Sequence, residues 1–276
     1  MRFGFIVPNL LSPVSHSAAA IKTSAQLAEA VGFDTLWTTD HILMPQEYPQ
    51  YGQGTEAIAT IACLAGVTER IGLGLSVLIL PMRNPLIVAK QIASIVHLSG
   101  REFIVGLGVG WNRDEYGFLN ADFSRRGKHN DEFITILRKL WSQSSPEHTG
   151  TYTFSGVLSF PTLDPLPQIW IGGSSDAALK RAATLGDGYH PNPTETIEEY
   201  AARVARVRDM AGERPITMSM RLTLDMRVGS AQAVDYLGQL QEVGLEYPVV
   251  NLKHDTLGDL VSSIETFGRD VMPAFA

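Results

Sequence analysis

Two short stretches of this sequence combine residue types that can move a proton or hold an anion. His41 follows an apolar run and has Asp40 beside it. An imidazole at the end of a strand can donate or accept a proton near neutral pH, or it can serve as a loop anchor. Gly172, Gly173 and Ser174 separate an apolar run from a predicted helix. Glycines let a backbone approach a ligand closely, and free N–H groups at a helix start bind phosphate. The alternative is an ordinary turn with a serine cap.

A third stretch alternates glycines at the end of a predicted strand. Gly106, Gly108 and Gly110 run directly into Trp111 and Asn112. The stretch lacks the third glycine spacing and the following helix of a dinucleotide fingerprint, so a Rossmann site is not indicated. Alternating glycines leave room for a flat ring against the backbone, or for tight packing of strand on helix. We expect Gly108, Trp111 and Asn112 to contact a flat ligand.

Apolar runs alternating with amphipathic stretches predict the elements that position these residues. The predicted strands cover residues 3–7, 35–38, 71–80, 102–108, 168–171, 188–190, 216–224 and 247–252, and the predicted helices 17–31, 56–67, 85–98, 125–141, 176–185, 194–210, 231–243 and 256–270. Continuous apolar runs are typical of parallel strands buried on both faces. Eight such units predict a closed (β/α)8 TIM barrel, with a doubly wound open sheet as the alternative. A barrel carries its site at the strand C-termini, which adds Asn192 to the candidates.

Two segments interrupt this alternation. We expect one domain over residues 1–276, with a loop insertion at about 111–124 and a β-hairpin insertion at about 145–167. The hairpin is predicted because residues 151–154 and 158–160 alternate in polarity around a Ser-Gly turn.

Composition excludes several classes of function. The net charge is −7 without a dense Lys/Arg block, so we expect no nucleic-acid or anionic-membrane partner. The apolar run 71–80 is far too short to span a membrane, and a strand begins at residue 3 without a leader, so we expect a cytoplasmic protein. The seven histidines show no metal-ligand spacing, and the single cysteine, Cys63, is expected in the core of an apolar helix. We expect no metal.

Several motifs follow one another in a fixed order over nearly the whole chain. They occupy residues 37–41, 72–85, 89–91, 98–101, 106–111, 169–174 and 186–189. In this order they resemble the luciferase-like monooxygenase superfamily, and within it the subgroup of coenzyme F420-dependent oxidoreductases. The resemblance implies a luciferase-like barrel that transfers hydride between a deazaflavin, F420, and a small organic substrate.

The resemblance also implies roles for individual residues. A non-proline cis peptide between Ser76 and Val77 is expected to bulge against the flat ring. Residues 172–174 match the phosphate-contacting segment. His41 matches a histidine near the reactive face of the ring, with Asp40 orienting it or contacting the cofactor.

The chain departs from relatives that oxidise sugar phosphates or secondary alcohols. They carry a tryptophan where this chain has Met44 and Pro45, and a glutamate where Trp111 stands. The substrate therefore stays open, and water or the substrate can replace the missing acid. FMN is the alternative cofactor, with an FMN-dependent monooxygenase served by a separate flavin reductase, or a non-catalytic flavin carrier, as the alternative functions.

We also expect a homodimer, because the predicted helix 85–98 carries more apolar residues than the core needs. These are Ile92, Ile95 and Val96. The alternative is that all of them pack onto the strands.

Overall fold

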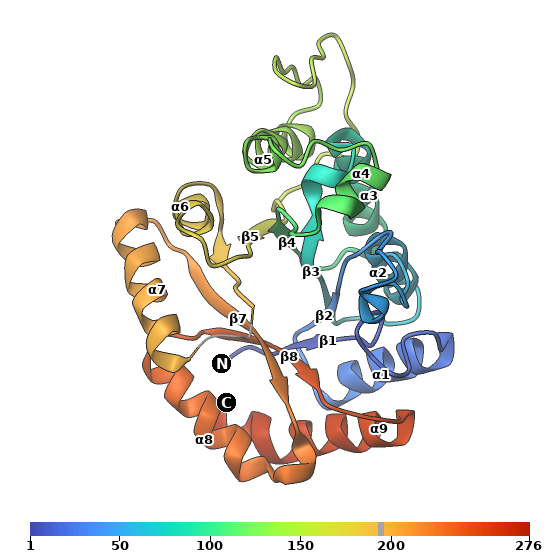
Figure 1. The fold of residues 1–276 in the computed structure, drawn as a ribbon, viewed down its shortest axis with the longest axis vertical. Coiled ribbons are helices and arrows are strands. Elements are labelled where there is room, and N and C mark those ends of the chain that lie inside the picture. Colours follow the sequence, from blue (N-terminus) through green and yellow to red (C-terminus); the bar gives the residue numbers. More distant parts are fainter. Residues whose placement is uncertain (193–195) are drawn as a thin grey trace.

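A closed barrel of eight parallel strands forms the centre of the molecule (Figure 1). The computed structural model describes residues 1–192 and 196–276. The strands are β1 (Gly4–Ile6), β2 (Thr35–Thr38), β3 (Gly72–Ile79), β4 (Phe103–Gly108), β5 (Gln168–Ile171), β6 (Gly188–Tyr189), β7 (Thr217–Leu224) and β8 (Tyr247–Leu252). Each strand pairs with the next in sequence, and β8 closes onto β1 through Val249 and Gly4. The predicted (β/α)8 barrel is confirmed, and the open doubly wound sheet is wrong.

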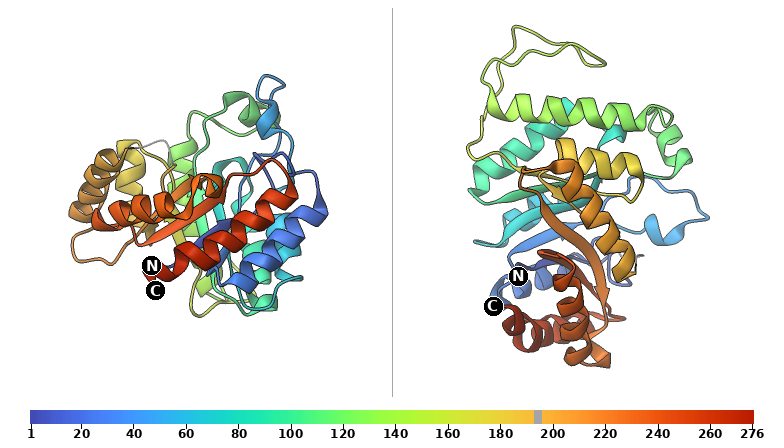
Figure 2. Two further views of the ribbon diagram at one scale, coloured as in Figure 1. Left: turned by 90° about the horizontal axis from the view of Figure 1, so that it is seen from below. Right: turned by 90° about the vertical axis from the view of Figure 1, so that its left-hand side faces the viewer.

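Helices cover the outside of the barrel (Figures 1 and 2). They are α1 (Ala18–Val31), α2 (Ala57–Ala65), α3 (Pro85–Ser99), α4 (Arg113–Phe118), α5 (Arg126–Ser142), α6 (Asp176–Leu185), α7 (Ile197–Ala211), α8 (Ser230–Glu242) and α9 (Leu257–Thr266). The start predicted for the α7 helix, residue 194, lies outside the described residues. The chain ends meet, because the amino group of Met1 donates to the carbonyl of Phe275 at 2.8 Å.

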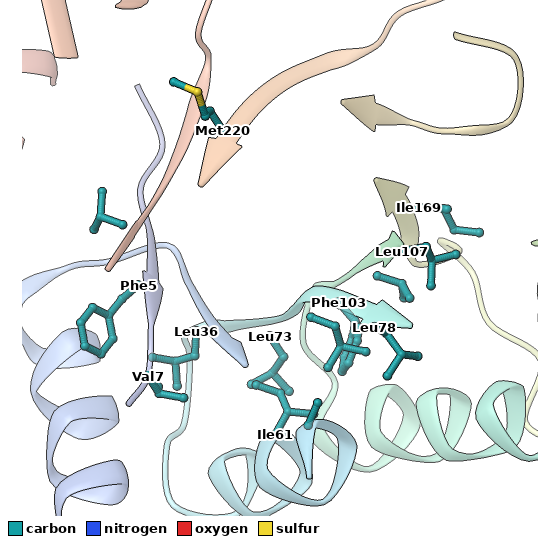
Figure 3. Close-up of a cluster of buried hydrophobic side chains, with 14 of the residues drawn as sticks. Phe5, Val7, Leu36, Ile61, Leu73, Leu78, Phe103, Leu107, Ile169 and Met220 are labelled. Carbon is teal, nitrogen blue, oxygen red and sulfur yellow. The ribbon is translucent and has the colours of Figure 1, made fainter. Parts of the chain in front are cut away.

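The strands are buried on both faces, which explains their continuous apolar runs. Outward-facing side chains such as Leu36 and Leu73 pack against helices in the main core (Figure 3). Because side chains alternate along a strand, the neighbouring residue Trp37 points into the barrel. There it joins Trp170, and their ring centroids lie 5.3 Å apart. The interior cluster comprises Ile6, Trp37, Ile104, Trp170, Tyr247 and Val249.

Glycines on the strands make room for these two indoles. A Cβ atom on Gly74 would lie 2.6 Å from Cε3 of Trp37, and one on Gly188 would lie 2.5 Å from Cδ1 of Trp170. Both distances are far below van der Waals contact, and the indoles are enclosed on all sides. The interior is therefore a packed core, in which glycine on the strands compensates for the size of the tryptophans.

The two predicted insertions differ from expectation. The β-hairpin at about 145–167 does not form: pairing within this described segment is limited to one antiparallel bridge between His148 and Phe154. The run 158–160 instead binds the end of α5, where the Ser159 amide donates to Ser144 and its hydroxyl to Leu140. The segment projects beyond α5 at the top of Figure 1. The loop insertion at about 111–124 contains helix α4.

Two expectations about helix faces also change. Cys63 is exposed, not in the core, because the buried face of α2 is made by other residues, including Ile61 and Leu64. Ile92 and Ile95 are buried in the main core, and Val96 is partly buried and packs against it, so none of the three forms an exposed apolar surface. The observation behind the homodimer is therefore wrong, and the homodimer itself stays a prediction. Among the described residues, no helix combines the length and apolar character needed to cross a membrane.

We predict that Gly74→Ala destabilises the protein by about 1–3 kcal/mol, the usual cost of overpacking a core that cannot expand. The matched control is Gly238→Ala in α8, where a Cβ would meet nothing within 4 Å. This control should gain about 0.5–1 kcal/mol, because alanine favours a helix interior. Urea unfolding of both variants measures the difference, and equal unfolding free energies would contradict tight packing around Trp37.

Candidate functional site

A buried histidine–glutamate pair lies at the C-terminal end of the barrel. His41 follows β2, and its Nδ1 lies 2.8 Å from Oε2 of Glu115, a residue of α4. The other carboxylate oxygen of Glu115 accepts from the Ile42 amide at 2.7 Å. The side chains of His41 and Glu115 are only 7% and 1% exposed. Since a carboxylate accepts, Nδ1 of His41 carries a proton and Nε2 is the nitrogen left for proton exchange with a ligand.

The sequence around α4 explains how Glu115 reaches this position. Asn112 caps α4, and its side-chain oxygen accepts from the Glu115 amide at 2.8 Å. Asn112 thus fixes the first turn of the helix that carries Glu115. Sequence reasoning sought an acidic partner at the position of Trp111 and missed Glu115. The spacing of Asn112 and Glu115, a cap residue with glutamate three positions later, was the signal that could have revealed it.

Aromatic rings pack around the imidazole of His41. The ring of Tyr51 lies 4.9 Å from the imidazole and that of Trp111 lies 6.0 Å from it, both edge-on. Tyr48 packs against Trp111 with centroids 5.1 Å apart. Trp111 is nevertheless 48% exposed. The histidine therefore faces a rim of flat, amphipathic rings, two of which come from a long loop whose sequence carried no periodic signal.

Asp40 is committed to the scaffold. Its carboxylate accepts from the Ile79 amide at 2.9 Å and from Arg83 at 2.8 Å, and Arg83 also binds Glu56. Burial raises the pKa of the Asp40 carboxyl, an effect that Arg83 opposes. Asp40 makes no hydrogen bond to His41 in the described structure; it ties the end of β2 to the end of β3. Beside it, the buried hydroxyl of Thr39 has no hydrogen-bond partner among the described residues.

The predicted cis peptide between Ser76 and Val77 is confirmed. Val77 is the one residue of β3 that is not fully buried. A Cβ on Gly108 would lie 2.6 Å from Cγ2 of Val77, and one on Gly172 would lie 2.9 Å from its Cγ1. The glycines at these strand ends therefore make room for Val77 itself. The space beside Gly108 is filled by Val77, so contact of Gly108 itself with a flat ring stays a prediction.

Ser76 belongs to a buried chain of hydrogen bonds. Its hydroxyl lies 2.8 Å from Nε2 of His190, whose Nδ1 lies 2.8 Å from the hydroxyl of Ser219. The Ser219 hydroxyl donates to the carbonyl of Tyr247, so Nδ1 of His190 must donate and Nε2 accept from Ser76. The imidazole also stacks on Trp37 at 5.4 Å. Burial, together with the charge of Arg221, lowers the pKa of His190 to about 3, so its ring is neutral.

The segment 172–174 leads into α6. The Gly172 amide donates to the Leu107 carbonyl, and Gly173 has a φ of 105°, a conformation that favours glycine. Ser174 is exposed, and Ser175 is the residue that caps α6 by accepting from the Ala178 amide. Ser174 is thus separate from the cap.

Asn192 is exposed beside residues 193–195, which lie outside the described part of the chain. Within that part, no group of three or more His, Cys, Asp or Glu side chains is arranged to hold a metal ion.

Comparison with known proteins agrees with this architecture. Residues 1–251 match the family of luciferase-like monooxygenases. An uncharacterized protein of Mycobacterium tuberculosis (strain ATCC 25618 / H37Rv) is 33% identical over 270 residues, which cover 90% of each chain. The FMNH2-dependent dimethylsulfone monooxygenase of Pseudomonas fluorescens (strain Pf0-1) is 30% identical over 76% of this chain and 60% of its own.

Two solved structures share the fold over the whole length. One is an F420-dependent secondary alcohol dehydrogenase in complex with an F420-acetone adduct, with a TM-score of 0.85, 16% identity, and coverage of 100% of this chain and 99% of its own. The other is monooxygenase RslO1 from Streptomyces bottropensis, with a TM-score of 0.81, 18% identity and full coverage of both chains.

The fold and the site define a (β/α)8 barrel with a buried histidine–glutamate pair at its strand C-termini. With the family match over most of its length, the chain belongs to the luciferase-like monooxygenases, whose members are oxidoreductases or monooxygenases.

We predict that His190 makes stability depend on pH. Its folded pKa of about 3 lies below the ordinary 6.5, so between these values the unfolded chain binds a proton that the folded chain does not. Stability is therefore full above pH 6.5 and falls as the pH drops, by up to about 1.4 kcal/mol per pH unit. His190→Gln should lack this component. Denaturant unfolding from pH 7 to pH 4 measures both slopes, and parallel curves would contradict the prediction.

Proposed function

We propose that this protein is a coenzyme F420-dependent oxidoreductase that transfers hydride between a deazaflavin and a small organic substrate. The observation that carries the proposal is the buried His41–Glu115 pair at the barrel rim. Hydride transfer to a carbonyl, imine or activated alkene leaves negative charge that an acid must neutralise. A positioned imidazole with a carboxylate on its far nitrogen serves this purpose in either direction of the reaction.

The chain's own residues account for the proton. As an imidazolium, His41 gives the proton on Nε2 to the reduced substrate and becomes neutral; as a neutral imidazole, it takes a proton on Nε2 from the substrate being oxidised. In both states Glu115 accepts from Nδ1, and it balances the charge of the imidazolium. Trp111 and Tyr51 limit the access of water to this nitrogen. The bound deazaflavin would supply the hydride chemistry.

Several residues at the barrel mouth support the proposal of a flat ring with a phosphorylated side chain. Val77 offers an apolar surface at the end of β3, and the neighbouring Gly108 and Gly172 carry no side chain that would cover it. The unpartnered hydroxyl of Thr39 is available to a polar ring edge. Residues 172–174, with Asn192 beyond them, would hold the phosphate at the start of α6.

A second candidate is an FMN-dependent monooxygenase that receives reduced flavin from a separate reductase. The 30% identity to the dimethylsulfone monooxygenase favours it. Titration of the protein with F420 and with FMN, each in oxidised and reduced form, gives four dissociation constants that separate the two candidates. At least ten-fold tighter binding of F420, with hydride transfer under anaerobic conditions, supports the proposal. Tighter binding of reduced FMN with oxygen consumption supports the alternative, and binding without either reaction supports a flavin carrier.

We predict that His41→Ala lowers turnover by about 10²–10⁴-fold, because a general acid–base residue is lost, with little change in cofactor affinity. Glu115→Gln should lower turnover by about 10–10²-fold, since the neutral amide cannot balance the imidazolium. The matched control is the pair of His148 and Glu132, 3.2 Å apart beside α5 and away from the strand C-termini. His148→Ala and Glu132→Gln should leave turnover unchanged. Normal single-turnover hydride transfer in a folded His41→Ala variant would eliminate the histidine.

We predict that Ser174→Ala weakens binding of FMN about ten-fold but leaves binding of riboflavin, which lacks the phosphate, unchanged. The reason is the loss of one charge-assisted hydrogen bond to phosphate. Ser175→Ala should instead cost about 1 kcal/mol of stability, because it removes the cap of α6. Fluorescence titration and urea unfolding measure the two effects. Equal losses for both ligands in Ser174→Ala would place the phosphate elsewhere.

A further inference from the structure

Arg221 is a cation at the barrel mouth whose role the proton chemistry does not explain. It lies on the inward face of β7, where its backbone amide donates to the Pro191 carbonyl. Its guanidinium donates through Nη1 to the carbonyl of Ser76, at 3.2 Å. This carbonyl belongs to the cis peptide that precedes Val77. Because β3 and β7 lie on opposite sides of the closed eight-stranded order, the side chain reaches across the mouth.

Within residues 1–192 and 196–276, no acidic side chain balances the charge of Arg221. Over the described residues, no aspartate or glutamate forms an ion pair with it, whereas Arg83, Arg138 and Arg181 pair with Asp40, Asp187 and Asp131. Two other partly buried arginines also lack a carboxylate partner, but each donates to two backbone carbonyls and a further acceptor: Arg101 and Arg214. Burial lowers the pKa of Arg221 to about 10, so the group is still a cation at neutral pH. A desolvated charge without a counter-charge is costly, and such groups are retained where a ligand supplies the missing charge.

The surroundings of Arg221 are those of the candidate site. Ser76 and Val77 form the floor of the mouth, and the neutral ring of His190 lies beneath it. Tyr51, whose ring centroid lies 4.9 Å from that of His41, is also near Arg221. A ligand lying over Val77 therefore meets a proton-exchanging group at one edge and a positive charge at the other. One guanidinium N–H serves Ser76, which leaves a planar set of donors for a two-pronged contact.

We propose that Arg221 binds a planar or trigonal anion, with negative charge shared between two adjacent acceptor atoms, at the mouth of the barrel. Two sources present this chemistry. One is the pyrimidine edge of a reduced, anionic flavin-type ring, and this source rests on the proposed function. The other is a carboxylate or sulfonate group of the substrate, which does not require a particular ring. A guanidinium recognises both through parallel N–H···O or N–H···N contacts.

The experiment separates charge from hydrogen bonding. Arg221→Gln can still donate to the Ser76 carbonyl but carries no charge, and Arg221→Lys keeps the charge without the planar fork. Arg227→Gln is the matched control, since Arg227 is an exposed arginine in the turn after β7 that pairs with Asp225 and Asp255. Circular dichroism and thermal unfolding establish that each variant is folded.

Two measurements then follow. The first is the ratio of dissociation constants for reduced and oxidised F420, and for reduced and oxidised FMN, under anaerobic conditions. The second uses the ligand-free protein, titrated calorimetrically with benzoate and with methanesulfonate at constant ionic strength. This second titration involves no cofactor, so it stays informative if neither ring binds and the proposed function fails.

If the ring is the source, Arg221→Gln should weaken binding of the reduced form roughly 10–100-fold relative to the oxidised form, the range expected for a lost charged hydrogen bond. If the substrate is the source, Arg221→Gln should weaken binding of benzoate or methanesulfonate by a similar factor. Arg221→Lys should lie between the wild type and Arg221→Gln, and Arg227→Gln should match the wild type. If Arg221→Gln does not fold, Arg221→Lys replaces it in the test, and a loss of at least three-fold in its affinity for the reduced ring or for the anions supports the proposal. Unchanged affinities for the reduced rings and for both anions in a folded variant would overturn the proposal.

Discussion

The closure of the barrel around two indoles is the constraint on which the rest of the structure depends. Trp37 and Trp170 occupy the interior, and the strands can surround them only where Gly74 and Gly188 offer no side chain. Glycines play the same part at the strand ends, where they leave room for Val77 after the cis peptide. Glycines on neighbouring strands therefore serve both the packing of the core and the shape of the floor of the mouth.

A buried polar chain connects this core to the mouth. His190 stacks on Trp37 and accepts from Ser76, while its other nitrogen donates to Ser219. Every hydrogen-bonding group of the imidazole is thereby used, which lets a polar ring lie in an apolar barrel at little cost. Its neutrality matters as well, because a second positive charge beside Arg221 would make the mouth harder to desolvate.

The fold could be predicted from the sequence because strands buried on both faces have nearly continuous apolar sequences, and amphipathic helices have apolar residues with a period of 3.6. The candidate site could be predicted only in part. His41 and the segment 172–174 could be recognised from their residue types and their positions after predicted strands. Glu115 could not, because its position depends on the short helix α4 within a segment predicted to be a loop. The segment 145–167 alternates in polarity without becoming a hairpin, because its second half binds α5 instead. The alternation of Met and Leu with polar residues along β7 places Arg221 on the inward face, but nothing in the sequence indicated that its side chain reaches Ser76.

The two charged features of the mouth are complementary in kind. The carboxylate of Glu115 accepts hydrogen bonds from His41 and from the Ile42 amide, so both of its oxygens are occupied within the protein and offer little to a ligand. Arg221 donates one N–H to the neutral carbonyl of Ser76, so its charge remains available to a ligand that lies over Val77. A reaction that moves hydride and proton separately creates and removes negative charge at two points. In the proposed reaction, a fixed cation at one edge and an imidazole that exchanges a proton at the other would stabilise both points without moving the backbone. Electrostatic catalysis relies on groups that are preorganised in this way.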